Sequence, residues 1–283
     1  MQISGRTRVF MVVADPVAQV QAPAVFNALF QRHAVDAVLV PAHVAAADFA
    51  GFARHVLAAR NIDGLWLTIP HKTAAVALLD RCDAAGRAAR AVNALRREAD
   101  GTLSGGLFDG LGFVAALRQQ GFAPRGRRVL LVGTGGAGVA IAAALVDAGV
   151  GALALFDAAP GRAAEVAGQL ARPGAAAIAL PASADPAGFD LVVNCTPLGL
   201  DEHDPLPFDV ARVDAGARVV DILMKPAPTP LLRECTARGL LAHPGFEMLV
   251  QQVPAYLDFF GLTGLAAAVR DDLAAVRALL QRR

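Results

Sequence analysis

Short apolar runs alternate with helical hydrophobic patterns along the second half of the chain. Each run is five or six residues long and is bounded by glycine, proline or charged residues, as is typical of strands buried on both faces. The runs occupy residues 128–132, 152–156, 176–180, 190–194 and 217–222. This alternation predicts a parallel, doubly wound α/β sheet.

The first part of the chain also mixes strand and helix periods. We predict strands at residues 8–14, 36–40, 64–69, 91–95 and 102–107, of which the last two form a hairpin around a glycine turn. We predict helices at residues 23–33, 47–60, 71–79, 83–89 and 109–120. Two further helical patterns, 248–260 and 265–280, end the chain and are expected to pack back on this first part.

A glycine-rich turn follows the first strand of the predicted parallel sheet. Gly133, Gly135 and Gly138 have the spacing G-x-G-x-x-G, with Gly136 and Ala137 between them, and a helical pattern begins there. Such a strand, turn and helix bind a pyrophosphate at the N-terminus of the helix. The next strand ends at Asp157, about 20 residues further on, where a carboxylate can bind the ribose 2′-OH of NAD.

The sequence therefore predicts two domains of different roles. The clearest change of composition lies over residues 121–128, just before the first strand of the dinucleotide-binding unit. We assign residues 1–109 plus 246–283 to a substrate-binding α/β domain, and residues 110–245 to a dinucleotide-binding domain of the Rossmann type.

Composition narrows the class of protein. The chain has 283 residues, 55% of them hydrophobic, and a formal net charge of +1, which argues against a nucleic-acid or anionic membrane partner. Its three cysteines are far apart and suggest neither a disulfide framework nor a metal cluster. The apolar window 137–156 is divided by Asp147 and a glycine turn, so we expect a soluble, cytoplasmic protein without a membrane span.

Few polar residues lie where chemistry could take place. Lys72 stands in the first turn of a predicted helix, where the helix dipole disfavours a cation, although a solvated lysine explains it about equally well. Asp109 could be an ordinary helix cap, and Thr68 only a strand former. Asn93 is an amide within an apolar strand. Asn194 and Thr196 follow a strand of the parallel sheet, at the edge where ligands bind.

Together these segments resemble the shikimate/quinate dehydrogenase family over nearly the whole chain and in the same order. The matching segments are Asp15-Pro16-Val17-Ala18, Leu67-Thr68-Ile69-Pro70-His71-Lys72, Ala91-Val92-Asn93, Asp109-Gly110-Leu111-Gly112, the loop 133–138, Asn194-Cys195-Thr196-Pro197-Leu198-Gly199 and Gly245-Phe246-Glu247-Met248-Leu249-Val250-Gln251-Gln252.

The resemblance implies roles for particular residues. Lys72 would move the proton of the reacting hydroxyl, and Asp109 would orient and charge it. Thr68, Asn93 and Gln252 would bind the hydroxyls of the substrate ring, and Gly245 would belong to the cofactor site with Asn194 and Thr196. Cofactor choice favours NAD through Asp157, since NADP-using members have Asn-Arg-Thr there, but Arg162 leaves NADP open.

The chain also departs from the family pattern around the substrate. Val20 and Ala22 replace two serines that hold the substrate carboxylate in the family, and Trp66 replaces an asparagine. Leu107-Phe108 replaces Asn-Thr ahead of the catalytic aspartate, and Met224 takes the place of a common tyrosine. We therefore expect the chemistry to be the family's, and the substrate to be shikimate itself or an alcohol with less negative charge.

Three alternatives stay open at this point. The chain could be a paralogue that acts on a different alcohol, a folate-type two-domain dehydrogenase, or a catalytically inactive dinucleotide sensor. We expect a monomer or homodimer, with a small alcohol and a nicotinamide dinucleotide as its partners.

Overall fold

The computed structural model describes residues 3–18, 20–171, 177–225 and 227–281. The chain divides into two compact units, residues 1–108 with 252–283 and residues 109–251. The boundaries predicted from the sequence were 109/110 and 245/246. Each unit is described below by itself.

The first unit is built on a mixed sheet of six strands in the order β2-β1-β3-β5-β6-β4. Its strands β1, β2 and β3 are parallel, whereas β5 and β6 form an antiparallel hairpin. Their bounds are β1 Arg8–Ala14, β2 Ala37–His43, β3 Ile62–Leu67, β4 Arg81–Cys82, β5 Ala94–Arg97 and β6 Leu103–Gly106. The short strand β4 was not predicted, because two residues carry no period.

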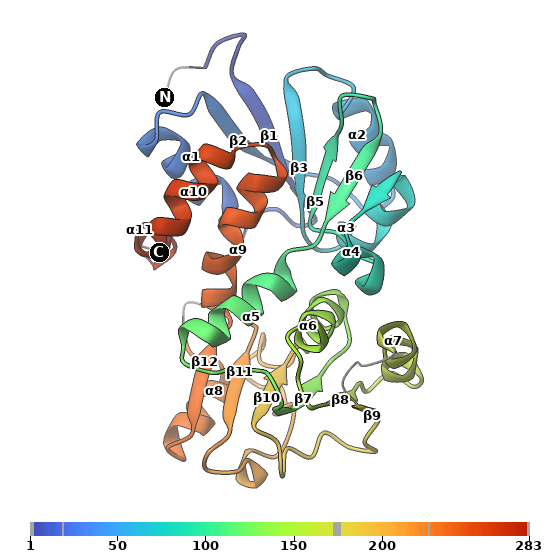
Figure 1. Cartoon of the computed structure of the whole chain (residues 1–283), viewed down its shortest axis with the longest axis vertical. Helices are drawn as coiled ribbons and strands as arrows, with labels where there is room; N and C mark the ends of the chain where they lie inside the picture. Colours follow the sequence, from blue (N-terminus) through green and yellow to red (C-terminus); the bar gives the residue numbers. More distant parts are fainter. Residues whose placement is uncertain (1–2, 19, 172–176, 226, 282–283) are drawn as a thin grey trace. The chain divides into compact units, whose positions relative to one another are not determined.

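Helices cover both faces of this sheet (Figure 1). On one side lie α2 (Phe49–Val56), α3 (His71–Ala74), the 3₁₀ helix η1 (Ala75–Leu78) and α4 (Ala84–Ala89). On the other lie α1 (Ala22–Arg32), α9 (Phe246–Phe259) from residue 252 onward, α10 (Thr263–Asp271) and α11 (Leu273–Gln281). The C-terminal helices thus return to the first unit, as predicted, but the pattern 265–280 is divided into α10 and α11 at Asp272, whose φ of −133° is not helical.

Successive side chains of β1 and β3 point to opposite faces of the sheet, and each face packs into its own core. Val13, Leu65 and Leu67 face α2 and η1 in an aliphatic core. Phe10 and Trp66 face the opposite way, into an aromatic cluster with Phe26, Phe30, Tyr256 and Phe260.

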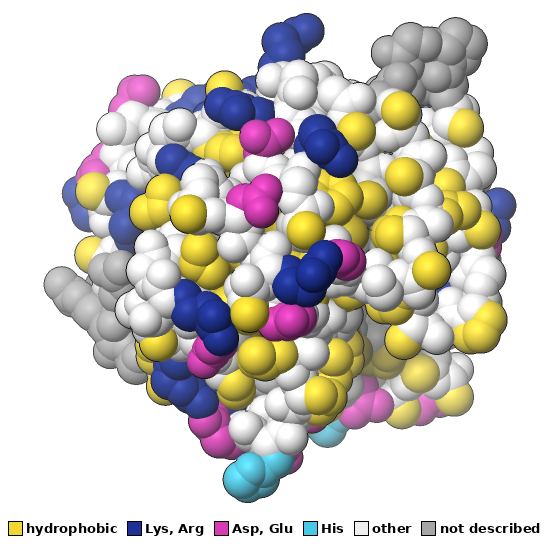
Figure 2. Space-filling view, turned by 90° about the horizontal axis from the view of Figure 1, so that it is seen from below, with side chains coloured by type: hydrophobic (Ala, Val, Ile, Leu, Met, Phe, Trp, Pro, Cys, Tyr) yellow, Lys and Arg dark blue, Asp and Glu magenta, His cyan; other side chains and the backbone are white. Residues whose placement is uncertain are grey.

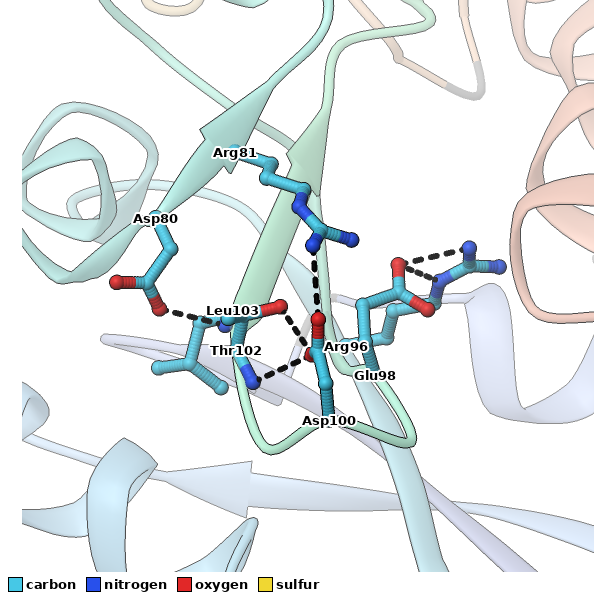
Figure 3. A network of polar contacts seen from close by, with 7 residues as sticks. All are labelled: Asp80, Arg81, Arg96, Glu98, Asp100, Thr102 and Leu103. Carbon is cyan, nitrogen blue, oxygen red and sulfur yellow. Dashed lines mark hydrogen bonds and ion pairs between the residues drawn. The ribbon is translucent and has the colours of Figure 1, made fainter.

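A polar network fixes the hairpin of β5 and β6 (Figure 3). Asp100 accepts hydrogen bonds from the turn residue Thr102 and from Arg81, at 2.7 Å for the arginine. Leu103 donates its backbone N–H to Asp80 at 2.8 Å, and Arg96 pairs with Glu98 at 2.8 Å. The hairpin thereby brings the residue before β5, Asn93, beside the residues that follow β6.

The second unit contains a six-stranded parallel sheet in the order β12-β11-β10-β7-β8-β9. Its strands are β7 Arg128–Val132, β8 Ala152–Phe156, β9 Ala177–Ala179, β10 Leu191–Asn194, β11 Arg218–Asp221 and β12 Leu241–Pro244. This is the doubly wound Rossmann order, in which strand order reverses at β7. The predicted α/β fold is confirmed; the edge strand β12 was missed, and residue 176 of one predicted strand lies outside the described residues.

Helices flank this parallel sheet too. They are α5 Asp109–Gln119, α6 Gly136–Asp147, α7 Arg162–Leu170 and α8 Pro230–Ala237, with a 3₁₀ turn η2 at Val210–Arg212. On one face, Leu130, Val132 and Val192 pack with Val210 of η2 and Leu231 of α8.

Two surface observations complete the fold. Figure 2 shows one face of the molecule, where charged side chains of both signs are intermingled with apolar ones and no continuous basic area stands out. In the part of the chain that the structure describes, no helix combines the length and apolar character needed to cross a membrane. The apolar window 137–156 is instead mostly α6 and β8.

Candidate active site

The candidate residues of the first unit gather where β1 and β3 end. Thr68 follows β3 and donates its backbone N–H to Val13 at 3.2 Å, while its carbonyl accepts from His71 at 2.8 Å. Lys72 is half-buried in the first turn of α3, and its carbonyl accepts from the backbone N–H of Val92 at 2.9 Å. These backbone bonds bring the Lys72 segment beside Asn93, far along the chain.

Asn93 ties several elements together and is fully buried. Its side-chain oxygen accepts from the backbone N–H of Phe108 at 3.1 Å, and its carbonyl accepts from Leu67 at 2.7 Å. The Tyr256 hydroxyl lies 3.5 Å from the same carbonyl. Asn93 therefore orders the end of β3, the chain after β6 and helix α9.

At the start of α1, the two positions where the family has serines carry apolar side chains. Ala22 is the first residue of the helix, and Gln21 before it makes no side-chain capping bond. Val20 closes a turn by donating its backbone N–H to Val17 at 3.0 Å. Neither Val20 nor Ala22 has a side chain that could donate a hydrogen bond to an anion.

Two aromatic residues predicted to shape the substrate site are packed against other rings. Trp66 is 3% exposed and stacks on Phe260 with ring centroids 4.0 Å apart, and on Tyr256 at 5.7 Å. Phe108 packs edge-on against Tyr256 at 5.1 Å. Trp66 thus fills the aromatic cluster of the core, and its role toward a substrate stays a prediction.

Buried polar groups without partners mark this unit. Among the described residues, the Trp66 Nε1, both ring nitrogens of His71 and the Gln252 Oε1 are buried and meet no hydrogen-bond partner. His71 stacks on Phe49 with ring centroids 4.6 Å apart. Burial lowers the pKa of His71, and the nearby Val44 backbone and Asp15 carboxylate only partly offset this. His71 lies in a segment that matches the family, in which only its neighbour Lys72 was assigned a role. No local sequence pattern indicates that His71 is buried.

In the second unit the glycine loop has the predicted form. Gly133 has a φ of +96°, which favours glycine, and a side chain at Gly138 would come within 2.1 Å of the Gly133 carbonyl oxygen. Side chains at Gly135 or Gly136 would meet nothing within 4 Å. The loop therefore packs closely at Gly133 and Gly138 and leaves free space beside Gly135 and Gly136. Gly135 is the N-cap residue of α6.

Asp157 follows β8 and is bound to this loop. Its Oδ2 accepts from the backbone N–H and the hydroxyl of Thr134, both at 2.7 Å, and its Oδ1 accepts from Ala159 at 2.9 Å. Arg162 donates to the Thr134 carbonyl at 3.3 Å. Burial alone would raise the pKa of Asp157, but these hydrogen bonds and Arg162 outweigh it and hold the pKa below its usual value.

Asn194, Thr196 and Gly245 lie at the carboxyl edge of the same sheet. Asn194 ends β10 and pairs in register with Asp221 at the end of β11. Its side chain accepts from the Thr196 hydroxyl at 2.7 Å. The backbone N–H of Gly245, after β12, donates to the Asp221 carbonyl at 2.6 Å. Asp221 lies within the predicted strand 217–222, and no local pattern indicated that its carboxylate would join this edge.

Asp109 is the first residue of α5 and the first residue of the second unit. The next residue, Gly110, lets α5 approach α6, because a side chain there would lie 2.1 Å from the Ala140 carbonyl oxygen. The pairing of Asp109 with Lys72, which belongs to the first unit, stays a prediction.

Comparison with known proteins identifies the chain. Residues 12–95 match the family described as the shikimate dehydrogenase substrate binding domain. Shikimate dehydrogenase (NADP(+)) of Acidiphilium cryptum is 41% identical over 280 residues, which are 96% of this chain and 99% of the relative. The chain belongs to the shikimate dehydrogenase family.

Solved structures agree with this assignment. The 5-ketofructose reductase of Gluconobacter sp. strain CHM43 has a TM-score of 0.86 and 26% identity, covering 98% of this chain and 99% of that protein. Shikimate 5-dehydrogenase of Thermus thermophilus, in complex with NADP(H) and shikimate, has a TM-score of 0.80 and 28% identity, covering 94% and 99%. The predicted class, a shikimate dehydrogenase-like oxidoreductase that uses a nicotinamide dinucleotide, is confirmed. The folate-type alternative is not supported.

Proposed function

We propose that this family member transfers a hydride reversibly between NAD and the hydroxyl-bearing carbon of an uncharged or weakly charged polyol, with Lys72 as the proton carrier. A dinucleotide held by the glycine loop and Asp157 would supply the hydride chemistry, with the alcohol carbon as donor in one direction and the ketone carbon as acceptor in the other. Lys72 takes up the hydroxyl proton when the alcohol is oxidised and gives it back when the ketone is reduced. Asp109 would orient the lysine, as the family resemblance implies.

The second unit fits a dinucleotide through its own residues. The open outer side of Gly135 and Gly136 leaves room for a pyrophosphate at the N-terminus of α6, where backbone N–H groups are unpaired. The tight contact of Gly138 with Gly133 holds helix and strand close together.

The preference for NAD rests on Asp157. A carboxylate has about four acceptor sites, and three are used by Thr134 and Ala159, so Oδ1 can still accept a ribose hydroxyl. A carboxylate held charged at this position repels a 2′-phosphate. Arg162, which could otherwise bind that phosphate, donates to the loop instead. The Acidiphilium relative is named for NADP(+), so this preference separates the chain from it.

The substrate class rests on the missing donors at Val20 and Ala22. Each hydrogen bond from a hydroxyl to a carboxylate contributes roughly 1.5–3 kcal/mol, so losing two of them costs several kcal/mol of binding. The Gluconobacter enzyme gives independent support, since 5-ketofructose, which it is named for reducing, carries no carboxylate. Thr68, Asn93 and Gln252 would bind the neutral hydroxyls.

Shikimate itself is the second candidate, because the Acidiphilium relative is named a shikimate dehydrogenase. The experiment that separates the candidates measures initial rates for the full-length protein in both directions. Shikimate, quinate and a cyclic polyol are each combined with oxidised NAD or NADP, and an uncharged keto sugar is combined with NADH or NADPH.

We expect the highest kcat/KM with NAD(H) and an uncharged substrate. Fastest turnover of shikimate would overturn the substrate assignment, and fastest turnover with NADP would overturn the cofactor assignment. Tight NADH binding without turnover of any substrate would favour the dinucleotide sensor.

A further inference from the structure

A buried network of hydrogen-bonded polar groups lies at the carboxyl ends of β10 and β11. The Asp221 carboxylate is fully buried and accepts from the Thr229 hydroxyl at 2.6 Å, the Asn194 amide at 3.1 Å and the Leu223 backbone N–H at 3.2 Å. Among the described residues, no cation pairs with it. Burial raises the pKa of Asp221, which these hydrogen bonds only partly oppose. A buried, unpaired carboxylate is costly, so its position calls for a reason beyond packing.

Asn194 connects this hydrogen-bond network to the segment that follows β10. Its oxygen accepts from the backbone N–H of Thr196 at 3.0 Å and from the Thr196 hydroxyl, while its amide nitrogen also donates to the Leu198 carbonyl at 3.2 Å. The Thr196 hydroxyl in turn accepts from the Leu198 backbone N–H at 3.2 Å. The inner side of the segment 195–200 is thus held through Asn194 by the Asp221 carboxylate.

Lys225 holds the outer side of the same segment. Its ammonium donates to the Gly199 carbonyl at 3.2 Å and to the Leu200 carbonyl at 2.8 Å. The chain has 26 lysines and arginines, and only Lys72 and Lys225 are lysines. An ammonium is a compact donor that fits two consecutive carbonyl oxygens, whereas the planar fork of an arginine suits a carboxylate. The rarity of lysine points to a task at this position that arginine performs less well.

We propose that Asp221 and Lys225 are positioning residues, two ends of a clamp that fixes the segment 195–200 against the nicotinamide half of the bound dinucleotide. Ligands of a doubly wound sheet bind at the carboxyl ends of its strands, and this segment lies at that edge, next to the reversal of strand order at β7. The inference rests on the proposed function only in that a dinucleotide binds here. It does not depend on the identity of the substrate or on the choice of NAD over NADP.

The clamp acts on the rate of hydride transfer and much less on cofactor affinity. The pyrophosphate and ribose are held elsewhere, at the glycine loop and Asp157. Hydride transfer needs the reacting carbons about 3–3.5 Å apart, and a displacement of about 1 Å can cost roughly a hundredfold in rate. A loosened segment 195–200 would therefore lower kcat while the dinucleotide still binds.

Two variants test this without disturbing the buried carboxylate. Lys225→Met keeps the stem of the side chain and removes both hydrogen bonds to the segment. Thr196→Val keeps the volume and removes the hydroxyl that joins Asn194 to Leu198. Lys225→Arg should restore part of the activity, since a guanidinium can donate to one or both carbonyls. Arg238→Met, which removes an exposed cation just after α8 in the same unit, serves as the control.

The assays use the full-length protein with whichever dinucleotide and substrate the unmodified chain turns over fastest. For Lys225→Met and Thr196→Val we expect kcat to fall about tenfold or more, with an increased isotope effect when NADH deuterated at C4 is the donor. The Kd of NADH by fluorescence and the Tm should change little. A purely structural role would lower the Tm and leave the isotope effect unchanged.

Amide hydrogen exchange of residues 195–200 with NADH bound gives a second readout that needs no turnover. We expect faster exchange in both variants than in the unmodified chain and in Arg238→Met. Unchanged exchange, or a kcat within twofold of the unmodified chain in both variants, would overturn the clamp. An error in the proposed function would give a different result. The unmodified chain would then prefer another substrate or dinucleotide, but the order of the variants in kcat and in amide exchange would stay the same.

Discussion

The two units both gather polar residues at the ends of parallel strands, but they hold them in opposite ways. At the edge of the second unit, Asn194, Thr196 and Asp221 hydrogen-bond one another. Among the described residues, the buried side-chain nitrogens and oxygens without partners all lie in the first unit, on Trp66, His71 and Gln252.

The edge of the second unit is therefore shaped by hydrogen bonds within the protein, whereas the corresponding region of the first unit is shaped by packing. In the described part of the second unit no buried side-chain nitrogen or oxygen lacks a hydrogen-bond partner, so we expect the edge proposed for the cofactor to be preorganised. In the first unit the aromatic cluster forms much of the core, whereas Val20 and Ala22 are only partly buried, so we expect these two positions to tolerate exchange without disturbing the core. Substrate choice should therefore be easier to alter by substitution than cofactor geometry.

The largest effect is expected for Lys72→Ala, which removes the proposed proton carrier of the first unit. General acid–base catalysis contributes about 10²–10⁴-fold to a rate, so turnover should fall by that order. NADH affinity should stay nearly unchanged, because the dinucleotide is held by the second unit. Steady-state kinetics and a fluorescence titration measure the two quantities.

Arg97→Ala, which removes an exposed cation of the same unit, should leave both quantities unchanged. If turnover survives Lys72→Ala, the lysine is not the proton carrier, and the interpretation of the first unit as the catalytic half loses its main residue.

The next largest effect is expected when the missing donors are returned. Val20→Ser combined with Ala22→Ser should lower the KM for shikimate about tenfold or more, since each hydrogen bond to a carboxylate is worth roughly 1.5–3 kcal/mol. The KM for an uncharged polyol should not improve. Ala47→Ser, in an exposed turn before α2, is the matched control. An unchanged KM for shikimate would mean that these positions do not face the substrate.

Asp157→Asn should change cofactor preference while leaving substrate preference alone. Removing the charge ends the repulsion of a 2′-phosphate, and the ratio of kcat/KM for NAD to that for NADP should fall about tenfold, which corresponds to about 1.4 kcal/mol. The ratio is read from initial rates with both dinucleotides. Glu234→Gln, an exposed acid of α8, controls for the loss of one negative charge, and an unchanged ratio in Asp157→Asn would contradict the role of the carboxylate.

The smallest effect concerns stability in the first unit. Burial lowers the pKa of folded His71 below 6.5, so well above pH 6.5 the residue is neutral in both states and contributes no pH dependence. As the pH falls below 6.5 the unfolded chain takes up a proton that folded His71 does not, and the free energy of unfolding declines until the pH passes the folded pKa. Each unit by which a pKa is lowered corresponds to about 1.4 kcal/mol.

His71→Phe should remove this decline, because a phenyl ring can stack on Phe49 and does not titrate. Urea unfolding of both proteins at pH 7.5 and pH 5.5, chosen as about one unit on either side of the ordinary histidine pKa, measures the difference. The other histidines are present in both chains and cancel. Equal losses of stability on acidification would show that His71 is accessible or protonated in the folded state.

Local sequence patterns were enough for most of the fold. The strands β1, β7 and β8 have the predicted bounds, because apolar runs between turn residues identify buried strands directly. The glycine spacing and the carboxylate after β8 were equally local signals. Patterns failed where the signal was short or ambiguous, as at β4, at the edge strand β12 with its histidine and proline, and at Asp272 between α10 and α11.

The sequence by itself determined the alternation of strands and helices, the glycine loop, the candidate proton carrier Lys72 and the loss of two donors at the start of α1. Tertiary structure decided which buried polar groups are satisfied. Asp221 is 27 residues from Asn194, Trp66 stacks on rings from the far end of the chain, and His71 is buried by Phe49. The reason is that periodicity and backbone preference act over a few residues, whereas hydrogen-bond satisfaction and burial depend on groups that only the folded chain brings together.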